Sequence, residues 1–244
     1  MVERRHHAGV TTFFAEVAIA AGDVTLDKQA AHHAQVRRLA VGAAVVITDG
    51  RGHRGIGRIT ALDKKQIVAT IETVDSVSQP PAIHLFLPVA DRERMLWLAE
   101  KATELQITTW NPVLYRRSRS VSPRGDGESF DRKAQARMIS ALEQSAGAWL
   151  PTIHPVRDVA SVASEDSAYL LERGGPTFRG HLLKGGPVSL CVGPEGGFES
   201  DEVKTLRSNG WLIRSLGEVK LRFETAAVAA VAIARASLAP ERVG

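Results

Sequence analysis

Two glycine-bearing loops late in the chain carry the residue types that a ligand site needs. The first loop follows the apolar run at 188–192, which predicts a buried strand, and it contains Gly193, Pro194, Glu195, Gly196 and Gly197. The second begins where another predicted strand ends, and it contains Leu216, Gly217, Leu221, Arg222, Glu224, Thr225 and Ala226. Glycines let backbone N–H and C=O groups approach a ligand closely. Ligands of open α/β sheets bind at the carboxyl ends of strands, so we expect both loops to form one pocket.

Each loop also has a plainer interpretation as an ordinary strand-to-helix connection. Glu224 and Thr225 stand near the start of a predicted helix, where a carboxylate and a hydroxyl satisfy free N–H groups and a negative charge suits the helix dipole. The alanine-rich helix that follows is most simply a packing surface, within the chain or against a second subunit.

A second candidate for chemistry is a polar loop with four arginines, namely Arg116, Arg117, Arg119 and Arg124. No acidic residue is interleaved before Asp126, so the positive charge is not cancelled locally. This favours phosphate contact over a merely solvated loop. The net charge of +4 also suits a polyanionic partner. Other arginines that can extend such a surface are Arg4, Arg5, Arg37, Arg38, Arg51 and Arg54.

The segment 50–55 matches the pattern GxGxxG, which in dinucleotide-binding proteins stands between a strand and a helix. Here the following residues, 56–60, predict a strand instead of a helix. We therefore interpret the segment as a glycine-rich hairpin turn with positive-φ positions. Its side chains Arg51, His53 and Arg54 are placed to meet phosphate.

Metal and redox chemistry have little support in this sequence. The single cysteine, Cys191, lies inside an apolar run and is interpreted as a small buried hydrophobic residue. His32 and His33 have no suitably spaced acid or cysteine partner, so packing or RNA contact is favoured over metal binding. The first residues show no apolar segment of a secretion signal, and no long apolar stretch is free of charge. We expect a cytoplasmic protein without a membrane span.

The elements that must position these residues fall into two patterns. In the first third, residues 45–48, 56–60 and 66–71 predict short strands of a small barrel, preceded by a helix over 27–39. After the linker at 78–81, strands over 83–89, 107–114, 168–171, 188–192 and 211–216 alternate with helices over 92–105, 131–145, 200–208 and 224–238. Alternation of this kind predicts an α/β domain with a largely parallel sheet. We therefore expect domains at 1–78 and 82–244.

Taken together, these motifs resemble the 16S ribosomal RNA uracil-N3-methyltransferase family, which belongs to the SPOUT class of knotted methyltransferases. The resemblance includes the two glycine-bearing loops and extends over about residues 30–235. Further matching segments are His32-His33, Arg38-Leu39, Asp49-Gly50-Arg51-Gly52, Arg94-Met95, Lys101-Ala102-Thr103-Glu104-Leu105 and Glu143-Gln144-Ser145. The chain departs from the family pattern at Gln106, at Ala146–Ala148 and at Val219, where a glycine or arginines are usual, and Phe223 replaces a commonly small residue.

The resemblance implies a PUA-like β-barrel that binds RNA and a SPOUT-type α/β domain with a trefoil knot. S-adenosylmethionine (SAM) would be the cofactor, the 16S rRNA of the small ribosomal subunit the substrate, and the enzyme a homodimer that needs no metal. The implied cofactor-binding residues are Leu171, Glu172, Val192, Gly193, Pro194, Glu195, Gly196, Gly197, Leu216, Gly217, Leu221, Arg222, Thr225 and Ala226. Lys220, beside Val219, joins the arginines named above as a candidate RNA contact.

The expected reaction is methylation of uridine N3, which is protonated at neutral pH and therefore a poor nucleophile. Cations can stabilise the uracil anion, and the candidates are Arg222 and then Arg119. Glu224, or alternatively Glu195, can take the proton if burial raises its pKa. Two other hypotheses remain: methylation of another RNA position, such as a ribose 2′-hydroxyl, and a non-catalytic RNA-binding relative.

Overall fold

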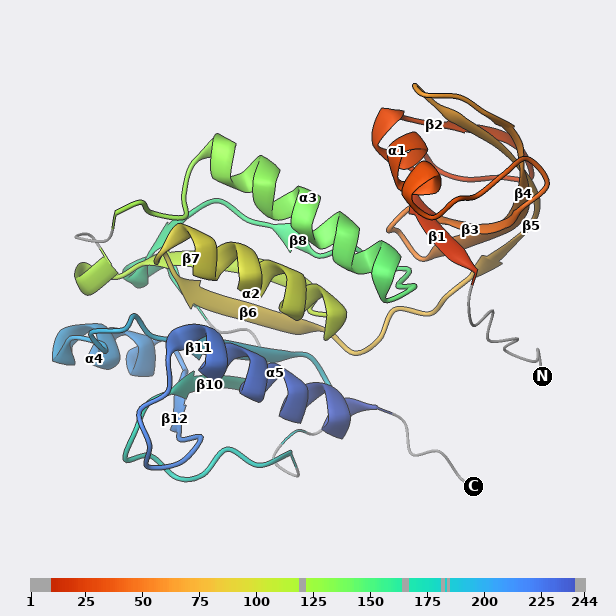
Figure 1. Cartoon of the computed structure of the whole chain (residues 1–244). Coiled ribbons are helices and arrows are strands. Elements are labelled where there is room, and N and C mark those ends of the chain that lie inside the picture. Colours follow the sequence, from red (N-terminus) through yellow and green to blue (C-terminus); the bar gives the residue numbers. More distant parts are fainter. Residues whose placement is uncertain (1–9, 119–121, 164–166, 181–182, 184, 240–244) are drawn as a thin grey trace. The chain divides into compact units, whose positions relative to one another are not determined.

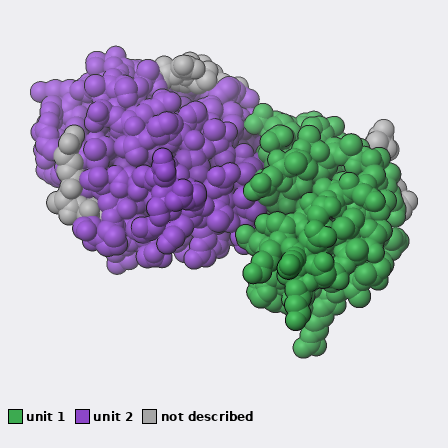
Figure 2. All heavy atoms as spheres, turned by 90° about the horizontal axis from the view of Figure 1, so that it is seen from above, with its two compact units in different colours: residues 1–79, 142–149 green, residues 80–141, 150–244 purple. Residues whose placement is uncertain are grey.

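The structure is a computed structural model that describes residues 10–118, 122–163, 167–180, 183 and 185–239. Figure 1 shows the course of the chain, and Figure 2 colours its two units. Unit 1 comprises residues 1–79 together with Leu142–Trp149, and unit 2 comprises Pro80–Ala141 and Leu150–Gly244.

Unit 1 is built on a curved five-stranded sheet in the order β1-β3-β4-β5-β2 (Figure 1). β1 pairs parallel with β3, and all other pairs in this sheet are antiparallel. Its elements are β1 (Thr11–Phe14), β2 (Gly22–Leu26), α1 (Lys28–Val36), β3 (Ala44–Thr48), β4 (His53–Leu62) and β5 (Ile67–Ser76). Side chains alternate across a strand, so Ile67, Ala69 and Ile71 of β5 all enter the core, where they meet Phe13 and Ile47.

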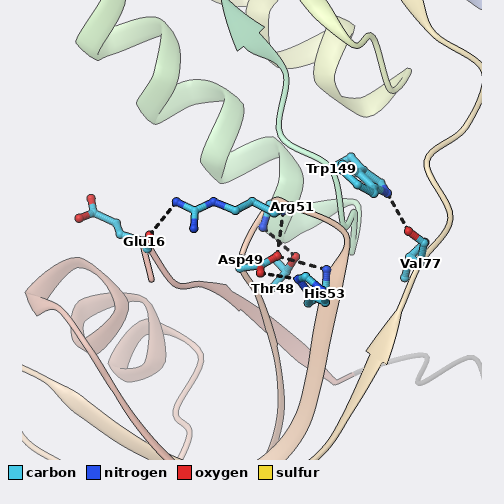
Figure 3. Close-up of polar contacts among 8 residues, drawn as sticks. Glu16, Thr48, Asp49, Arg51, His53, Val77 and Trp149 are labelled. Atoms are coloured by element: carbon cyan, nitrogen blue, oxygen red, sulfur yellow. Dashed lines mark hydrogen bonds and ion pairs between the residues drawn. The ribbon is translucent and has the colours of Figure 1, made fainter. Parts of the chain in front are cut away.

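The turn from β3 to β4 is the hairpin expected at the GxGxxG segment. Gly50 and Gly52 have positive φ values of 66° and 96°, and β4 follows directly, so the nucleotide-binding interpretation is excluded there. The Asp49 carboxylate, 3% exposed, accepts hydrogen bonds from the N–H groups of Arg51 (2.8 Å) and His53 (3.1 Å). Its second oxygen lies 2.8 Å from Nδ1 of His53 (Figure 3). One buried carboxylate thus fixes the tip of the hairpin.

The segment Leu142–Trp149 belongs to unit 1 through its hydrogen bonds. The Glu143 carboxylate accepts from the N–H of Phe14 (2.9 Å), and the carbonyl of Ala148 accepts from the N–H of Gly52 (2.8 Å). The Trp149 indole N–H donates to the carbonyl of Val77 (3.0 Å; Figure 3). These contacts bring a segment from the middle of the chain into the N-terminal unit, next to the hairpin tip.

Unit 2 contains a parallel sheet in the order β12-β10-β11-β6-β7-β8, and β9 also pairs with β7. Its strands are β6 (Ile83–Pro88), β7 (Thr109–Leu114), β8 (Thr152–Ile153), β9 (Arg157–Asp158), β10 (Ser167–Leu171), β11 (Val188–Val192) and β12 (Leu212–Arg214). Its helices are α2 (Arg92–Glu104), α3 (Glu128–Gln144, whose last residues fall in unit 1), α4 (Ser200–Ser208) and α5 (Phe223–Leu238), with short 3-10 helices η1 (Arg116–Ser118) and η2 (Val159–Ser161).

Two hydrophobic clusters cover the two faces of this sheet. On one face, Leu85 and Leu190 pack with residues of α2, α3 and α5, and α5 also packs against α2. On the other face, Phe86 and Cys191 pack with Leu206 of α4. Helices therefore lie on both sides of the parallel sheet, which confirms the expected α/β architecture. No helix in the described ranges is long and apolar enough to cross a membrane.

Several sequence predictions need correction in detail. β1 and β2 were not predicted, because one has only four residues and the other begins with Gly-Asp. The expected strand at 211–216 is shorter, spanning Leu212–Arg214. The helix expected over 200–208 has those bounds as α4, but a capping residue outside that range starts it: the N-cap is Glu199, whose side chain and that of Glu202 form a reciprocal capping box.

Candidate active site

The two glycine-bearing loops meet at one cavity on the carboxyl edge of the parallel sheet. β10, β11 and β12 are neighbours in that sheet, and each ends at this edge. The residues that line the cavity come from the segments that follow these strands: Leu171, Glu172, Arg173, Val192, Gly193, Pro194, Glu195, Gly196, Gly197, Phe198, Ser215, Leu216, Gly217, Val219, Lys220, Leu221, Phe223 and Ala226. The convergence expected from the sequence is therefore present in the fold.

All of the predicted cofactor-binding residues line this cavity except Arg222 and Thr225. Arg222 is the exposed N-cap residue of α5, and Thr225 is exposed on the first turn of that helix. Sequence reasoning missed Arg173, Phe198, Ser215, Val219 and Phe223 as lining residues, and it named Lys220 only as an RNA contact. Each of them lies within two residues of a predicted cofactor-binding residue, so extending the predicted segments by one or two residues would have included them.

The first loop owes its shape to its glycines. A Cβ at Gly193 would lie 2.6 Å from the ring of Phe198, so a larger residue cannot fit there without moving that ring. Gly197 has a φ of 78°, and its N–H donates to the carbonyl of Pro194 (2.8 Å), which closes a tight turn. The Phe198 ring in turn packs edge-on against Tyr115, with centroids 5.2 Å apart. The loop therefore forms a defined wall of the cavity.

The loop after β12 is also organised by local hydrogen bonds. The Ser215 hydroxyl donates to the carbonyl of Gly217 (2.8 Å) and accepts from its N–H (3.1 Å). Gly217 has a φ of 131°, which side chains rarely permit. The buried Ser215 thus bends the chain where β12 ends.

The cavity carries charges of both signs. Burial raises the pKa of the half-buried Glu172 carboxyl, although the N–H of Arg173 and the Arg173 charge act to lower it. Arg173 and Lys220 add cationic side chains. Glu195 forms an ion pair with Arg94 of α2. A polar ligand with both positive and negative groups finds complementary partners here.

The arginine-rich loop differs from its sequence interpretation. The positive charges of Arg116 and Arg117 are balanced by acids at the start of α4, about 80 residues away in sequence. Arg116 pairs with Asp201, and its N–H donates to the Glu202 carboxylate (2.7 Å). Arg117 pairs with Glu199 (2.8 Å), and Arg124 pairs with Asp126 (2.7 Å). The expectation of an uncancelled positive field is therefore wrong for these three arginines.

The catalytic candidates have different surroundings. Arg119 lies outside the described residues. Arg222 is exposed, between the lining residues Leu221 and Phe223. Glu224 is 8% exposed, and its Oε2 atom has no hydrogen-bond partner within the described part of the chain. Glu224 does not line the cavity, but it stands one residue from Phe223, which does.

The remaining candidate RNA contacts belong to unit 1, apart from Lys220. Arg37, Arg38 and Arg51 are exposed, and Arg54 is half-exposed. Arg51 extends from the fixed hairpin tip toward the carbonyl of Glu16 (3.4 Å; Figure 3). Arg4 and Arg5 lie outside the described residues.

Cys191 is fully buried, and its sulfur lies 3.0 Å from the Tyr115 hydroxyl. Burial raises the pKa of this thiol to about 12, which agrees with a structural role. In the ranges that the structure describes, no group of three or more His, Cys, Asp or Glu side chains is arranged to hold a metal ion.

Fold and site define an α/β protein with a ligand cavity at the carboxyl edge of a parallel sheet, joined to a small β unit. The RNA methyltransferase domain family matches residues 78–235, and the RNA methyltransferase PUA domain family matches residues 26–72. The protein therefore belongs to the RNA methyltransferase family.

Similar proteins agree with this membership. Ribosomal RNA small subunit methyltransferase E of Aquifex aeolicus is 29% identical over 82% of this chain and 89% of that protein. The protein of the same name from Synechocystis is 27% identical over 86% of this chain and 71% of its own length. A crystal structure of ribosomal RNA small subunit methyltransferase E from Neisseria gonorrhoeae, bound to S-adenosyl methionine, matches with a TM-score of 0.80 and 26% identity, covering 91% and 95% of the two chains. The expected family and fold class, with a PUA-like unit and a SPOUT-type α/β unit, are thus confirmed.

Proposed function

We propose that the protein transfers a methyl group from SAM to N3 of a specific uridine in the 16S rRNA of the small ribosomal subunit. The observation that carries this proposal is the single cavity at which the loops after β10, β11 and β12 converge. Membership of the RNA methyltransferase family and the similarity to a SAM-bound methyltransferase support the same conclusion.

The residues present in the cavity fit SAM. Leu171, Val192 and Leu216 offer apolar surface for an adenine ring, and the glycines expose backbone groups for hydrogen bonds. Glu172 can accept hydrogen bonds from hydroxyl or ammonium groups, while Arg173 and Lys220 suit a carboxylate. When bound, SAM supplies a methyl group activated by its sulfonium. The contribution of the protein is then to position the uracil and to exclude water.

Activation of the uracil requires removal of the N3 proton. We assign the role of proton acceptor to Glu224, whose Oε2 atom is buried without a hydrogen-bond partner among the described residues. The positive charge of Arg222, assisted by Arg119, would stabilise the uracil anion through its oxygens. Arg222 suits this role because it is exposed and stands between Leu221 and Phe223, which line the cavity.

We assign recognition of rRNA to unit 1 and to Lys220 at the cavity. The exposed guanidinium groups of Arg37, Arg38 and Arg51 can contact phosphates without further rearrangement. Homodimer formation is part of the proposal, because Trp97 of α2 is 46% exposed and the neighbouring α5 presents small side chains such as Ala236 on its outer side. Replacement Trp97→Glu should shift the protein to monomers in analytical ultracentrifugation.

The test uses purified protein, SAM with a labelled methyl group, and small ribosomal subunits that lack the modification. Nucleoside mass spectrometry of the digested rRNA should show one new product, 3-methyluridine. A 2′-O-methylated nucleoside as the main product would replace the proposed position by a ribose hydroxyl. SAM and RNA binding without any methylated product would support a non-catalytic relative instead.

A further inference from the structure

Two adjacent arginines of η1 make different use of the same acidic helix. Arg116 reaches Asp201 at the surface, where the two side chains are 59% and 62% exposed. Arg117 donates from Nε to the Glu199 carboxylate (2.8 Å) and from Nη1 to the carbonyl oxygen of Gly196. Only the second arginine therefore contacts the glycine-bearing loop of the cavity.

Packing between Arg117 and Gly196 is close enough to restrict the residue type in the loop. A Cβ atom added at Gly196 would lie 2.8 Å from Cδ and 3.3 Å from Cβ of Arg117. The aliphatic part of Arg117 thus covers the side of the loop from which the Gly196 side chain would project. Gly196 and Gly197 themselves line the cavity.

The acid that holds Arg117 is itself fixed. Glu199 is the N-cap of α4, and its N–H donates to the Glu202 carboxylate (2.8 Å) within the capping box. Glu202 also accepts the N–H of Arg116 (2.7 Å), which anchors the backbone of η1 to the same helix end. Arg117 therefore links the loop to a rigid helix terminus.

We propose that Arg117 is a positioning residue for the cofactor loop 193–197 and does not act as an RNA contact. This inference rests on the proposed function, in which SAM occupies the cavity. The planar guanidinium donates to two acceptors in a fixed arrangement, which a lysine ammonium on a flexible stem reproduces poorly. A loop held in its binding conformation loses less conformational entropy when the cofactor binds.

The experiment compares SAM affinity, measured by isothermal titration calorimetry on the full chain, in Arg117→Ala, Arg117→Lys and Arg116→Ala. The Arg116 variant is the matched control, because it removes the same charge from the neighbouring residue. Arg117→Ala should weaken SAM binding about tenfold, Arg117→Lys should recover part of the loss, and Arg116→Ala should stay within about twofold of the unaltered protein. Equal SAM affinities of Arg117→Ala and the unaltered protein would overturn the assignment.

A double-mutant cycle adds a readout that general destabilisation does not produce. Gly196→Ala should weaken SAM binding in the unaltered protein, because its Cβ meets the Arg117 stem. In the Arg117→Ala background, Gly196→Ala should reduce SAM affinity much less. Additive losses would show that Arg117 does not determine the space at Gly196, and would contradict the proposal. Thermal unfolding of each variant establishes that the folded protein is being titrated.

Measuring the binding of rRNA fragments distinguishes the two possible roles of Arg117, namely positioning of the cofactor loop and contact with RNA. Arg116→Ala and Arg117→Ala should change RNA affinity to a similar, small extent, since the two variants remove equal charge. If Arg117→Ala lost RNA affinity while its SAM affinity stayed unchanged, Arg117 would be an RNA contact and the proposal would be wrong. Failure of the unaltered protein to bind SAM would overturn the proposed function itself, whereas an effect missing only in the variants would overturn the role of Arg117.

Discussion

The main-chain N–H of Phe14 donates to the carboxylate of Glu143, 2.9 Å away and 129 residues later in the chain. Burial raises the pKa of this carboxyl to about 6, although the Phe14 hydrogen bond acts to lower it. His33 Nδ1 lies 3.7 Å from the other carboxylate oxygen. Burial, together with the charges of Arg37 and His32, lowers the pKa of His33, so this histidine does not neutralise Glu143 at alkaline pH.

The contribution of Glu143 to the stability of unit 1 should therefore fall as pH rises. The folded-state pKa of Glu143 lies above its ordinary value of 4.5, so the folded protein binds more protons between pH 4.5 and about 6. The stabilisation is present below this window and is lost above it. Glu143→Gln keeps an oxygen for Phe14 and should raise the free energy of unfolding at pH 8 by up to about 2 kcal/mol, with little change near pH 4.5.

Urea unfolding at the two pH values measures this difference. The control is Glu16→Gln, because Glu16 is an exposed carboxylate of the same unit. An effect of Glu143→Gln that is the same at both pH values would show that burial of the charge is not its cause.

The hairpin tip should depend on glycine at position 52. A Cβ there would lie 2.3 Å from the Trp149 ring, and φ is 96°. Gly52→Ala should destabilise unit 1 by about 2 kcal/mol or more, because backbone strain adds to a steric clash. Gly42→Ala isolates the clash, since Gly42 has a similar φ of 91° with nothing within 4 Å of its Cβ position. Thermal melting compares the two variants. If both lowered the melting temperature equally, the backbone conformation and not the steric clash would explain the whole loss of stability.

Local patterns determined how much of the fold could be predicted. β11 has the predicted bounds because all five of its residues are apolar or small and buried. α2 begins at the predicted Arg92, where the Asp91 carboxylate accepts the N–H of Arg94 (3.1 Å) as an N-cap. Both signals lie within a few neighbouring residues. The short β1 instead depends on its pairing with β3, a contact between distant segments.

In the candidate site, too, features set by neighbouring residues could be predicted, and contacts between distant segments could not. Its lining residues follow strand ends and carry glycines, so the sequence identified most of them. The partners of Arg116 and Arg117 were missed, because these pairs join residues 85 and 82 positions apart. A count of nearby acids cannot detect such pairs. Only the ion pairs between η1 and the start of α4 show that these cations are already neutralised.

Gln106 occupies a left-handed backbone position, with a φ of 58°, directly after the C-cap of α2. The methyltransferase family that the chain resembles usually has a glycine at this position, and glycine adopts this conformation without strain. Gln106→Gly should therefore stabilise unit 2 by up to about 1 kcal/mol. Gln106→Ala is the control, because it removes the side chain and keeps the strain. Differential scanning calorimetry should show a higher Tm only for glycine, and equal Tm values would contradict a backbone origin.

Arg222 stands between the cavity-lining Leu221 and Phe223 without lining the cavity itself. In the proposed mechanism its charge acts on the uracil anion and not on the cofactor. Arg222→Ala should therefore lower kcat at least about a hundredfold while the Kd for SAM changes less than about twofold. Arg222→Lys keeps the charge and should retain part of kcat. Single-turnover methylation and calorimetric titration measure the two quantities. If kcat and the affinity for SAM fall together in Arg222→Ala, the residue supports the cofactor loop at the start of α5, and charge stabilisation of the uracil must come from another cation.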